Sequence, residues 1–158
     1  MKKTLMVLTS LLIFVSLNMA VFAQNRIMKS KITKVSTRTH LFKKADQNYR
    51  LGKIKKARKF YKRSLSLGLD KAEKTAALNN ICALYNVAEK YNLARIYCTK
   101  ALKISPYYWR SYNNRGAAYF GLKLFDKAAY DFEKASDLSV SNKILKQNKK
   151  LVKPYLPR

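Results

Sequence analysis

The sequence has 158 residues, and its 34 Lys and Arg against 8 Asp and Glu give a net charge of +26 at neutral pH. Apolar residues make up 48%, which argues against global disorder in a chain of single-domain length. With 4 Gly and 3 Pro, the chain lacks the turn residues that an all-β fold requires. One His and few acids leave little material for a metal site or an acid–base pair, so composition favours a basic, helical, non-catalytic protein.

Residues 1–23 have the pattern of a bacterial secretory signal peptide. Two lysines near the start precede a charge-free apolar run, and Val21 and Ala23 provide small residues for cleavage ahead of Gln24. The alternative is an uncleaved membrane anchor, because an apolar run of about 18 residues can just span a bilayer. The small-residue site favours cleavage. We therefore predict a protein that is periplasmic or secreted after signal-peptide cleavage.

Beyond a basic leader at 24–37, which we interpret as flexible, the chain repeats itself every 34 residues. When 75–108 is aligned with 109–142, eight positions are identical, and such a period is typical of a solenoid. The identical pairs are Asn79/Asn113, Asn80/Asn114, Ala83/Ala117, Tyr85/Tyr119, Ala94/Ala128, Lys100/Lys134, Ala101/Ala135 and Ser105/Ser139. Each block holds two apolar-periodic segments around a polar break, as a helix–turn–helix unit requires. Ser105 before Pro106 is typical of a helix N-cap and first helical residue.

The repeated positions resemble those of the tetratricopeptide repeat (TPR) family, in which large residues alternate with small ones across a helix pair. The residues that carry the resemblance are Leu78, Cys82, Tyr85, Ala94, Cys98, Ala101 and Pro106 in one block, and Tyr112, Gly116, Tyr119, Ala128, Phe132 and Ala135 in the next. A looser block at 38–71 matches through Leu41, Ala45, Tyr49, Gly52, Ala57 and Tyr61. Lys44 and Arg115 depart from the pattern, since the family prefers Leu there.

The resemblance implies an all-α fold, a right-handed α-solenoid of three TPR-like helix–turn–helix repeats plus a C-terminal capping helix. The expected TPR domain covers 38–142, with repeats at about 38–71, 75–108 and 109–142, and the capping helix and tail occupy 143–158. Residues 72–74 are inserted before the second repeat. One helix pair cannot bury its apolar face alone, so three repeats are expected to stack into one core.

No constellation for catalysis is visible in the sequence, and we predict no enzyme activity, no metal and no cofactor. His40 lacks an acid and a nucleophile at a telling spacing, so a surface or capping histidine is the simpler interpretation. We expect the acids of the third repeat to solvate their helix and to pair with neighbouring lysines. These acids are Asp126, Asp131, Glu133 and Asp137, and the lysines are Lys127 and Lys134.

The strongest charge feature is a run of seven cations without an acid between residues 53 and 63. Its members are Lys53, Lys55, Lys56, Arg58, Lys59, Lys62 and Arg63. Such a run is either a solvated helix face or an anion-binding face, and the high net charge produces a strong positive potential in both cases. Acidic proteins, anionic envelope polymers and lipid headgroups fit this charge, whereas predicted export argues against nucleic acid.

A second candidate site is the inner wall, which in this family is lined by the first helix of each repeat. By resemblance, a peptide-binding groove would contain Lys43, Tyr49, Arg50, Asn79, Asn80, Asn86, Arg110, Asn113, Asn114 and Phe120. The recurring asparagines can hold a peptide backbone through amide donors and acceptors, although Asn at these places is also common in the family. The carboxylate clamp of heat-shock co-chaperones is met only by Asn80 and Arg110. Phe42 and Asp46 stand where Lys and Asn are expected, so that ligand class is not inferred.

The only two cysteines, Cys82 and Cys98, are expected to form a disulfide in the second repeat. The expected turn near Lys90 is eight residues from each, which puts both at the same height in an antiparallel helix pair. Both face inward at a close-contact site, and a bridge needs Cα atoms about 4.4–6.8 Å apart. The alternative is two buried thiols that act as small apolar residues.

Taken as a whole, the sequence predicts an exported scaffold that binds a protein or peptide, preferably acidic, through its groove and its basic face. The rival hypothesis is a cationic binder of anionic envelope polymers or membrane surfaces. The salt dependence of binding distinguishes the two hypotheses. Salt screens exposed charges and should strongly weaken polymer binding, whereas binding in the groove through Asn, Tyr and Phe should lose less affinity.

Overall fold

The computed structural model describes residues 40–139 and 143–156, and every regular element in that part of the chain is helical. The helices are α2 (His40–Arg50), α3 (Ile54–Ser64), α4 (Lys71–Val87), α5 (Tyr91–Ile104), α6 (Trp109–Gly121), α7 (Phe125–Asp137) and α8 (Lys143–Val152), with 3-10 turns η1 (Leu65–Leu67) and η2 (Lys153–Tyr155). The signal peptide and leader that we expect at 1–23 and 24–37 lie outside the described residues.

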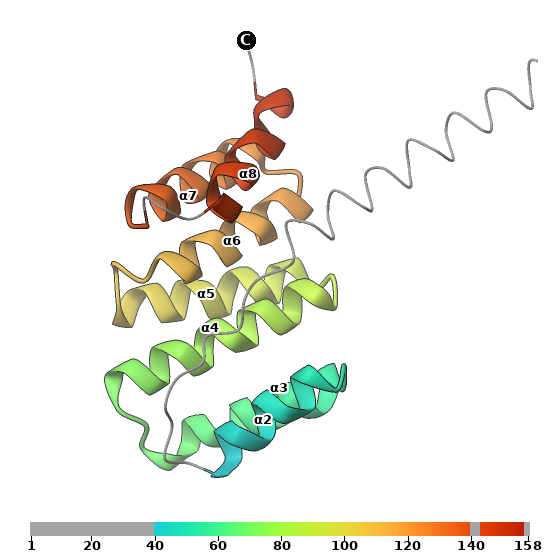
Figure 1. Cartoon of the computed structure of the whole chain (residues 1–158), viewed down its shortest axis with the longest axis vertical. Helices are drawn as coiled ribbons and strands as arrows, with labels where there is room; N and C mark the ends of the chain where they lie inside the picture. Colours follow the sequence, from blue (N-terminus) through green and yellow to red (C-terminus); the bar gives the residue numbers. More distant parts are fainter. Residues whose placement is uncertain (1–39, 140–142, 157–158) are drawn as a thin grey trace, which may run out of the picture.

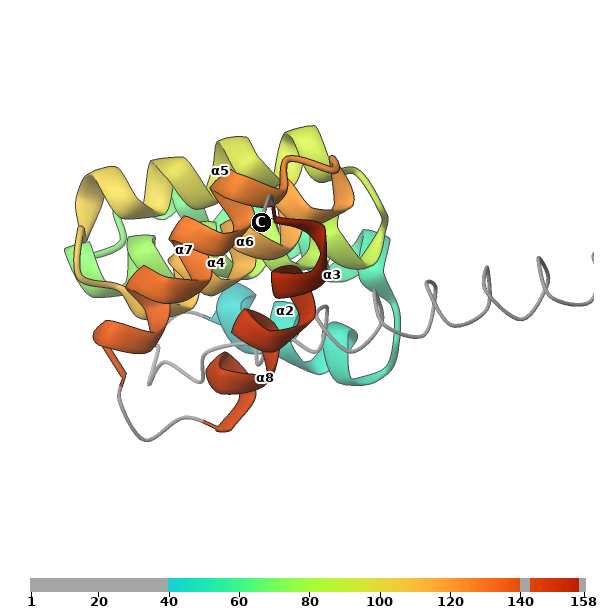
Figure 2. The same ribbon diagram turned by 90° about the horizontal axis from the view of Figure 1, so that it is seen from above.

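The helices form three antiparallel pairs that stack in chain order, and α8 covers the last pair (Figure 1). We name them repeat one (α2 and α3), repeat two (α4 and α5) and repeat three (α6 and α7). Viewed from the α8 end, successive pairs lie behind one another (Figure 2). The first helices of repeats two and three also contact each other directly. This arrangement confirms the predicted all-α repeat solenoid.

The turn inside each pair uses the same left-handed backbone position. Gly52 has a φ of +68°, Glu89 of +55° and Lys123 of +59°. Only the first of these is glycine, which adopts a positive φ without steric cost. Glu89 and Lys123 adopt a left-handed backbone conformation that is unfavourable for L-residues with a side chain. Packing of the helix pair therefore imposes the tight reversal at these two positions.

The three inserted residues lengthen α4 instead of forming a loop. Asp70 caps this helix, and its Oδ1 accepts a 2.8 Å hydrogen bond from the backbone N–H of Glu73. By contrast, the expectation for Ser105 is wrong. It ends α5 as its C-cap and lies four residues before α6, and its hydroxyl lies 3.0 Å from that of Thr75. The Ser–Pro pair therefore marks a connection between repeats, because the chain makes a further turn before α6 begins.

The centre of each pair is a site where a small residue of the first helix faces a residue sixteen positions later in the second. Repeat two has Cys82 and Cys98, with a sequence separation of 16. At the equivalent places repeat one has Ala45 and Tyr61, and repeat three has Gly116 and Phe132. All of the apolar residues at these places are fully buried. A Cβ on Gly116 would lie 2.8 Å from the Phe132 ring, so the helices touch there.

Helix α8 closes the last repeat, as the capping role predicts. Its Leu145 and Val152 are buried, and Val152 packs into the same cluster as Phe120 and Phe132. Lys149 pairs with Glu133 of α7 at 3.1 Å. Among the helices that the structure describes, none is both long and apolar enough to cross a membrane.

Candidate binding surfaces

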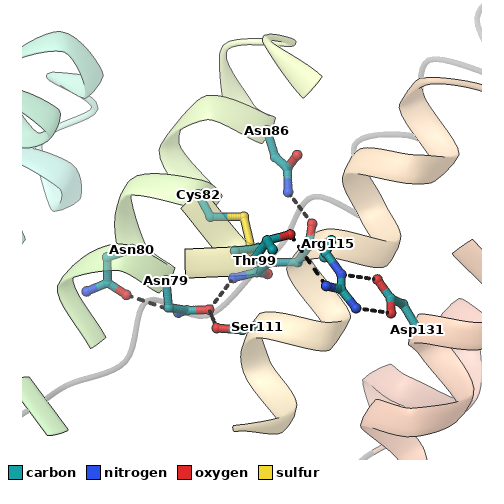
Figure 3. The surroundings of a disulfide bond; sticks show 10 residues. Asn79, Asn80, Cys82, Asn86, Thr99, Ser111, Arg115 and Asp131 are labelled. Atoms are coloured by element: carbon teal, nitrogen blue, oxygen red, sulfur yellow. Dashed lines mark hydrogen bonds and ion pairs between the residues drawn. A yellow bond between two sulfur atoms is a disulfide. The ribbon is translucent and has the colours of Figure 1, made fainter. Parts of the chain in front are cut away.

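The repeated asparagines are buried. Figure 3 shows Asn79 and Asn80 on α4, with the hydrogen bonds of Asn79. Asn114 of α6 donates through Nδ2 to Oδ1 of Asn79 in α4 at 3.0 Å, and the Ser111 hydroxyl lies 3.1 Å from the same oxygen. Asn86 donates through Nδ2 to the backbone oxygen of Asn114 at 2.7 Å. One repeat later, Asn148 of α8 donates to Oδ1 of Asn113 at 2.6 Å. The asparagines thus connect α4, α6 and α8 through a repeated hydrogen bond.

Asn80 occupies a buried position between repeats one and two. Its Oδ1 accepts a bond of 3.3 Å from Asn79, and it also interacts with the phenol of Tyr61 in α3. Burial raises the pKa of that phenol, and the nearby Asn80 amide opposes the shift. Sequence reasoning placed these amides on an open wall, whereas the structure gives them a part in helix packing. Peptide contact through Asn80 and Asn114 stays a prediction.

The remaining groove residues differ in access. Lys43 and Arg50 are exposed on α2, while Tyr49 and Arg110 are half-buried. Arg50 pairs with Asp46 at 2.7 Å, and the Arg110 guanidinium stacks 4.5 Å from the centre of the Trp109 ring. Accessible cations of the predicted groove are therefore found on the first and third repeats.

Phe120, also predicted for the groove, is buried in the core of the C-terminal end. Its ring lies 5.5 Å from those of both Phe125 and Tyr155, in edge-to-face contacts. The side chain contributes to the packing of α6 against α7 and the chain's end. Sequence reasoning missed this role because the partner Tyr155 lies beyond the repeats.

The predicted anion-binding face forms helix α3 and its N-cap. Lys53, Lys55, Lys56, Lys59, Lys62 and Arg63 are exposed, and Arg58 is half-buried. No acid is present in α3 to offset them, and no ion pair forms with any of these cations among the described residues. This helix is the most strongly cationic surface within the described part of the chain.

Two members of that face contact aromatic rings, and we call the group the tyrosine–cation cluster (Arg58, Lys62, Tyr85, Tyr97 and Lys100). The Arg58 guanidinium lies 4.7 Å from the centre of the Tyr85 ring. The Lys62 ammonium lies 5.6 Å from both ring centres, and that of Lys100 lies 5.4 Å from the centre of Tyr97. The two rings stack at 5.4 Å. The cluster joins α3 of repeat one to α4 and α5 of repeat two.

Repeat three has an ion pair between Arg115 and Asp131, where repeat two has Ile81 and Tyr97. Arg115 donates through Nε to Oδ2 of Asp131 at 2.7 Å and through Nη2 to Oδ1 at 2.8 Å (Figure 3). Asp131 is buried, so the expectation that it solvates its helix and pairs with Lys127 or Lys134 is wrong. The ion pair explains why Arg115 can stand where the family prefers Leu, because the buried Asp131 carboxylate neutralises the arginine. Burial raises the pKa of Asp131, while the bonds from Arg115 oppose that shift.

A pocket of about 330 Å³ lies beside this ion pair. It is lined by Arg115, Tyr119, Asp126, Lys127, Tyr130 and Asp131. Both signs of charge are present in its lining, whereas the cluster around Tyr85 contains no acid.

Cys82 and Cys98 meet as the helix geometry predicts. Their Cα atoms are 5.4 Å apart and their sulfur atoms lie at disulfide distance, 2.08 Å. Both side chains are fully buried. The predicted proximity is confirmed, and formation of the disulfide bond stays a prediction.

Among the described residues, no three His, Cys, Asp or Glu side chains gather closely enough to hold a metal ion. His40 is exposed at the first position of α2.

Comparisons with known proteins agree with this architecture. The tetratricopeptide repeat family model matches residues 110–139. The heat shock protein STI1 of Saccharomyces cerevisiae is 35% identical over 69 residues, which is 44% of this chain but only 12% of the yeast protein. The Arabidopsis OM64 TPR domain is 26% identical with a TM-score of 0.68, and the match covers 73% of this chain and 93% of that domain. The second TPR domain of human RPAP3, in complex with the HSP70 peptide SGPTIEEVD, is 25% identical with a TM-score of 0.65, covering 72% and 92%.

Proposed function

Because the chain is a tetratricopeptide-repeat protein, we propose that it is an exported scaffold that binds acidic segments of partner proteins. Its location would be the periplasm or the cell exterior, as the leader pattern indicates. The scaffold would offer two contact regions, the first helices of the predicted groove and the cationic helix α3. We assign it no catalytic step and no cofactor.

The observation that carries this proposal is the acid-free surface of α3. Its cations, all exposed except the half-buried Arg58, lack carboxylate partners within the described residues. A dense group of one sign raises the local concentration of oppositely charged ligands and speeds their association. Unpaired cations of this density favour an acidic ligand over a neutral or basic one.

The RPAP3 domain supports a peptide ligand, because it was solved with a bound peptide that carries two Glu and one Asp. In the present chain, exposed or half-buried cations of the first helices are available for such a ligand at Lys43, Arg50 and Arg110. Phe42, which stands where a clamp cation is expected, is buried edge-on against Tyr61 at 4.9 Å. A heat-shock C-terminus is therefore not the ligand we propose.

The second candidate function is binding of an anionic envelope polymer or membrane surface. The same exposed cations of α3 favour it, since they require no shaped groove to attract a polyanion. Such binding depends on exposed charge alone and is strongly screened by salt.

The functions are separated by titrating the purified protein with a fluorescently labelled Glu-rich peptide and with the same peptide carrying Gln for Glu. We expect saturable binding of the Glu peptide and weak binding of the Gln peptide, with affinity partly retained at about 300 mM salt. Parallel sedimentation with phosphatidylglycerol vesicles and with an anionic polysaccharide tests the alternative. Binding to vesicles or polysaccharide with none to either peptide would overturn the scaffold function.

Export is tested separately by N-terminal sequencing of the protein made in a bacterial host that secretes it. The expected mature chain begins at Gln24 and stays in the supernatant after centrifugation. Recovery of the intact Met1 terminus in the membrane pellet would instead support an uncleaved anchor.

A further inference from the structure

One of the charge differences between repeats two and three concerns two positions that face each other across the helix pair of repeat three. Position 131 of repeat three corresponds to position 97 of repeat two, and position 115 corresponds to position 81. Repeat three places Asp131 and Arg115 there, joined by two charge-assisted hydrogen bonds of 2.7 and 2.8 Å. Repeat two places Tyr97 and Ile81 there, so it lacks both the acid and its arginine.

Cations nevertheless gather around Tyr97. The Lys62 and Lys100 ammonium groups lie 5.6 and 5.4 Å from its ring centre, and Arg58 lies 4.7 Å from the neighbouring ring of Tyr85. Within the described residues no carboxylate reaches ion-pair distance of these three cations. Repeat two therefore has unpaired cations around position 97, whereas repeat three has an aspartate at the equivalent position 131, which pairs with its own arginine.

The tyrosine rings hold these cations in position. A cation over an aromatic face is attracted by the negative electrostatic potential of the ring. Interaction with the Tyr85 phenol is the main cause that raises the pKa of Lys62, so its ammonium stays charged throughout the physiological pH range. Side chains restrained in this way lose less conformational freedom when they bind an anion than free surface lysines do.

We propose that Arg58, Lys62 and Lys100, held against Tyr85 and Tyr97, form a subsite for a carboxylate side chain of an acidic partner segment. This subsite rests on the proposed function and specifies where on the scaffold the acidic segment binds. A protein carboxylate is favoured because repeat three holds an aspartate at the equivalent position. The Arg58 guanidinium can bind both oxygens of such a group in the way that Arg115 binds Asp131.

The test is the affinity of the Glu-rich peptide for a cluster variant and a charge-matched control. Arg58→Gln with Lys62→Gln removes one arginine and one lysine from the cluster. Lys59→Gln with Arg63→Gln removes the same two residue types from α3, but neither residue contacts a ring. We expect the affinity of the cluster variant for the peptide to fall about tenfold or more, because a charge-assisted contact is lost. The affinity of the control variant should change less than about threefold.

A third variant, Tyr97→Asp, gives repeat two the acid that repeat three has at this position. We expect the new carboxylate to take the cations for itself and to weaken peptide binding about as much as the cluster variant does. Circular dichroism and the denaturation midpoint show whether each variant remains folded. Tyr97→Asn is the matched control for Tyr97→Asp, because it also removes the ring but adds no charge, and it should bind the peptide more tightly than the Asp variant does.

The outcomes separate the subsite from the scaffold function. Equal losses in the cluster variant and its control would overturn the subsite and leave the scaffold function standing, because total charge alone would explain both. No peptide binding by the unaltered protein would instead overturn the scaffold function. If Arg58 and Lys62 affect only a phosphorylated peptide or phosphatidylglycerol vesicles, the subsite takes phosphate, and the carboxylate proposal is wrong.

Discussion

In repeat two, Cys82 of the first helix meets Cys98 of the second, whereas 34 residues later Gly116 meets the ring of Phe132. In repeat two, Ile81 and Tyr97 flank that contact, and in repeat three Arg115 and Asp131 stand in their places. The two repeats thus share a backbone arrangement and differ in what fills it. Repeat three closes through packing and an internal ion pair, while repeat two closes through a cysteine pair and turns two tyrosines toward cations of α3.

The difference shows that the pair contact and the surface chemistry are set independently. The contact sixteen residues apart needs only that the two side chains fit between closely spaced helices, which Gly–Phe, Cys–Cys and Ala–Tyr all do. The neighbouring positions then decide whether charge is satisfied within the repeat or left for a ligand. Replacing residues in each class should therefore affect stability and binding separately.

Replacing the ring at the centre of repeat three should have the largest effect on stability. Phe132→Ala removes a fully buried aromatic side chain against Gly116 and leaves a cavity, so we expect a loss of about 3–5 kcal/mol. Guanidinium denaturation followed by circular dichroism measures it. A loss below about 1 kcal/mol would mean that the helices do not depend on this contact.

Removing the cysteine pair of repeat two, which we predict to be bridged, should cost slightly less stability. Cys82→Ala with Cys98→Ala frees a loop of about 15 residues in the unfolded chain, which is expected to lower stability by about 3 kcal/mol. The same denaturation experiment measures the change. Thiol titration of the denatured, unreduced protein, recovered from the host used for the export test, is the control. Two reactive thiols would show that the cysteines are not bridged.

Breaking the ion pair of repeat three should have the smallest of these three effects. Asp131→Asn leaves Arg115 without its counter-charge, and because the arginine side chain is 17% exposed we expect a loss of about 2 kcal/mol, below that of a fully buried pair. The matched variant Arg115→Ile with Asp131→Tyr copies repeat two. The free energy of unfolding of this double variant should remain within about 1 kcal/mol of that of the unaltered protein, because an apolar pair can replace a buried ion pair. Equal destabilisation of both variants would contradict this explanation.

The repeat architecture could be predicted from the sequence because its signal is periodic and its small residues mark where helices touch. The pairing of Cys82 with Cys98 followed from the same geometry, since equal distances from a turn fix equal heights. The start of α4 could not be placed, because an inserted segment capped by Asp70 reads equally well as a loop or as an extra helical turn.

The roles of polar residues were harder to predict, because they depend on which partner the fold brings near. Asn79 and Asn114 repeat at a regular interval, yet periodicity does not tell whether an amide faces solvent or another helix. Asp131 shows the same difficulty, since its partner Arg115 is on the other helix of the pair. A signal was present in the case of Asp131. Arg115 replaces an expected Leu, and a buried cation requires an acid nearby.

The most direct test of the difference between repeats two and three is a two-dimensional amide NMR titration of the protein with the Glu-rich peptide. We expect the shifts to concentrate on α3 and on the residues of α4 and α5 around Tyr85 and Tyr97, with little change around Arg115 and Asp131. Shifts centred on the Arg115–Asp131 pair, or spread evenly over every exposed lysine, would contradict the claim that repeat two is the one left open to a ligand.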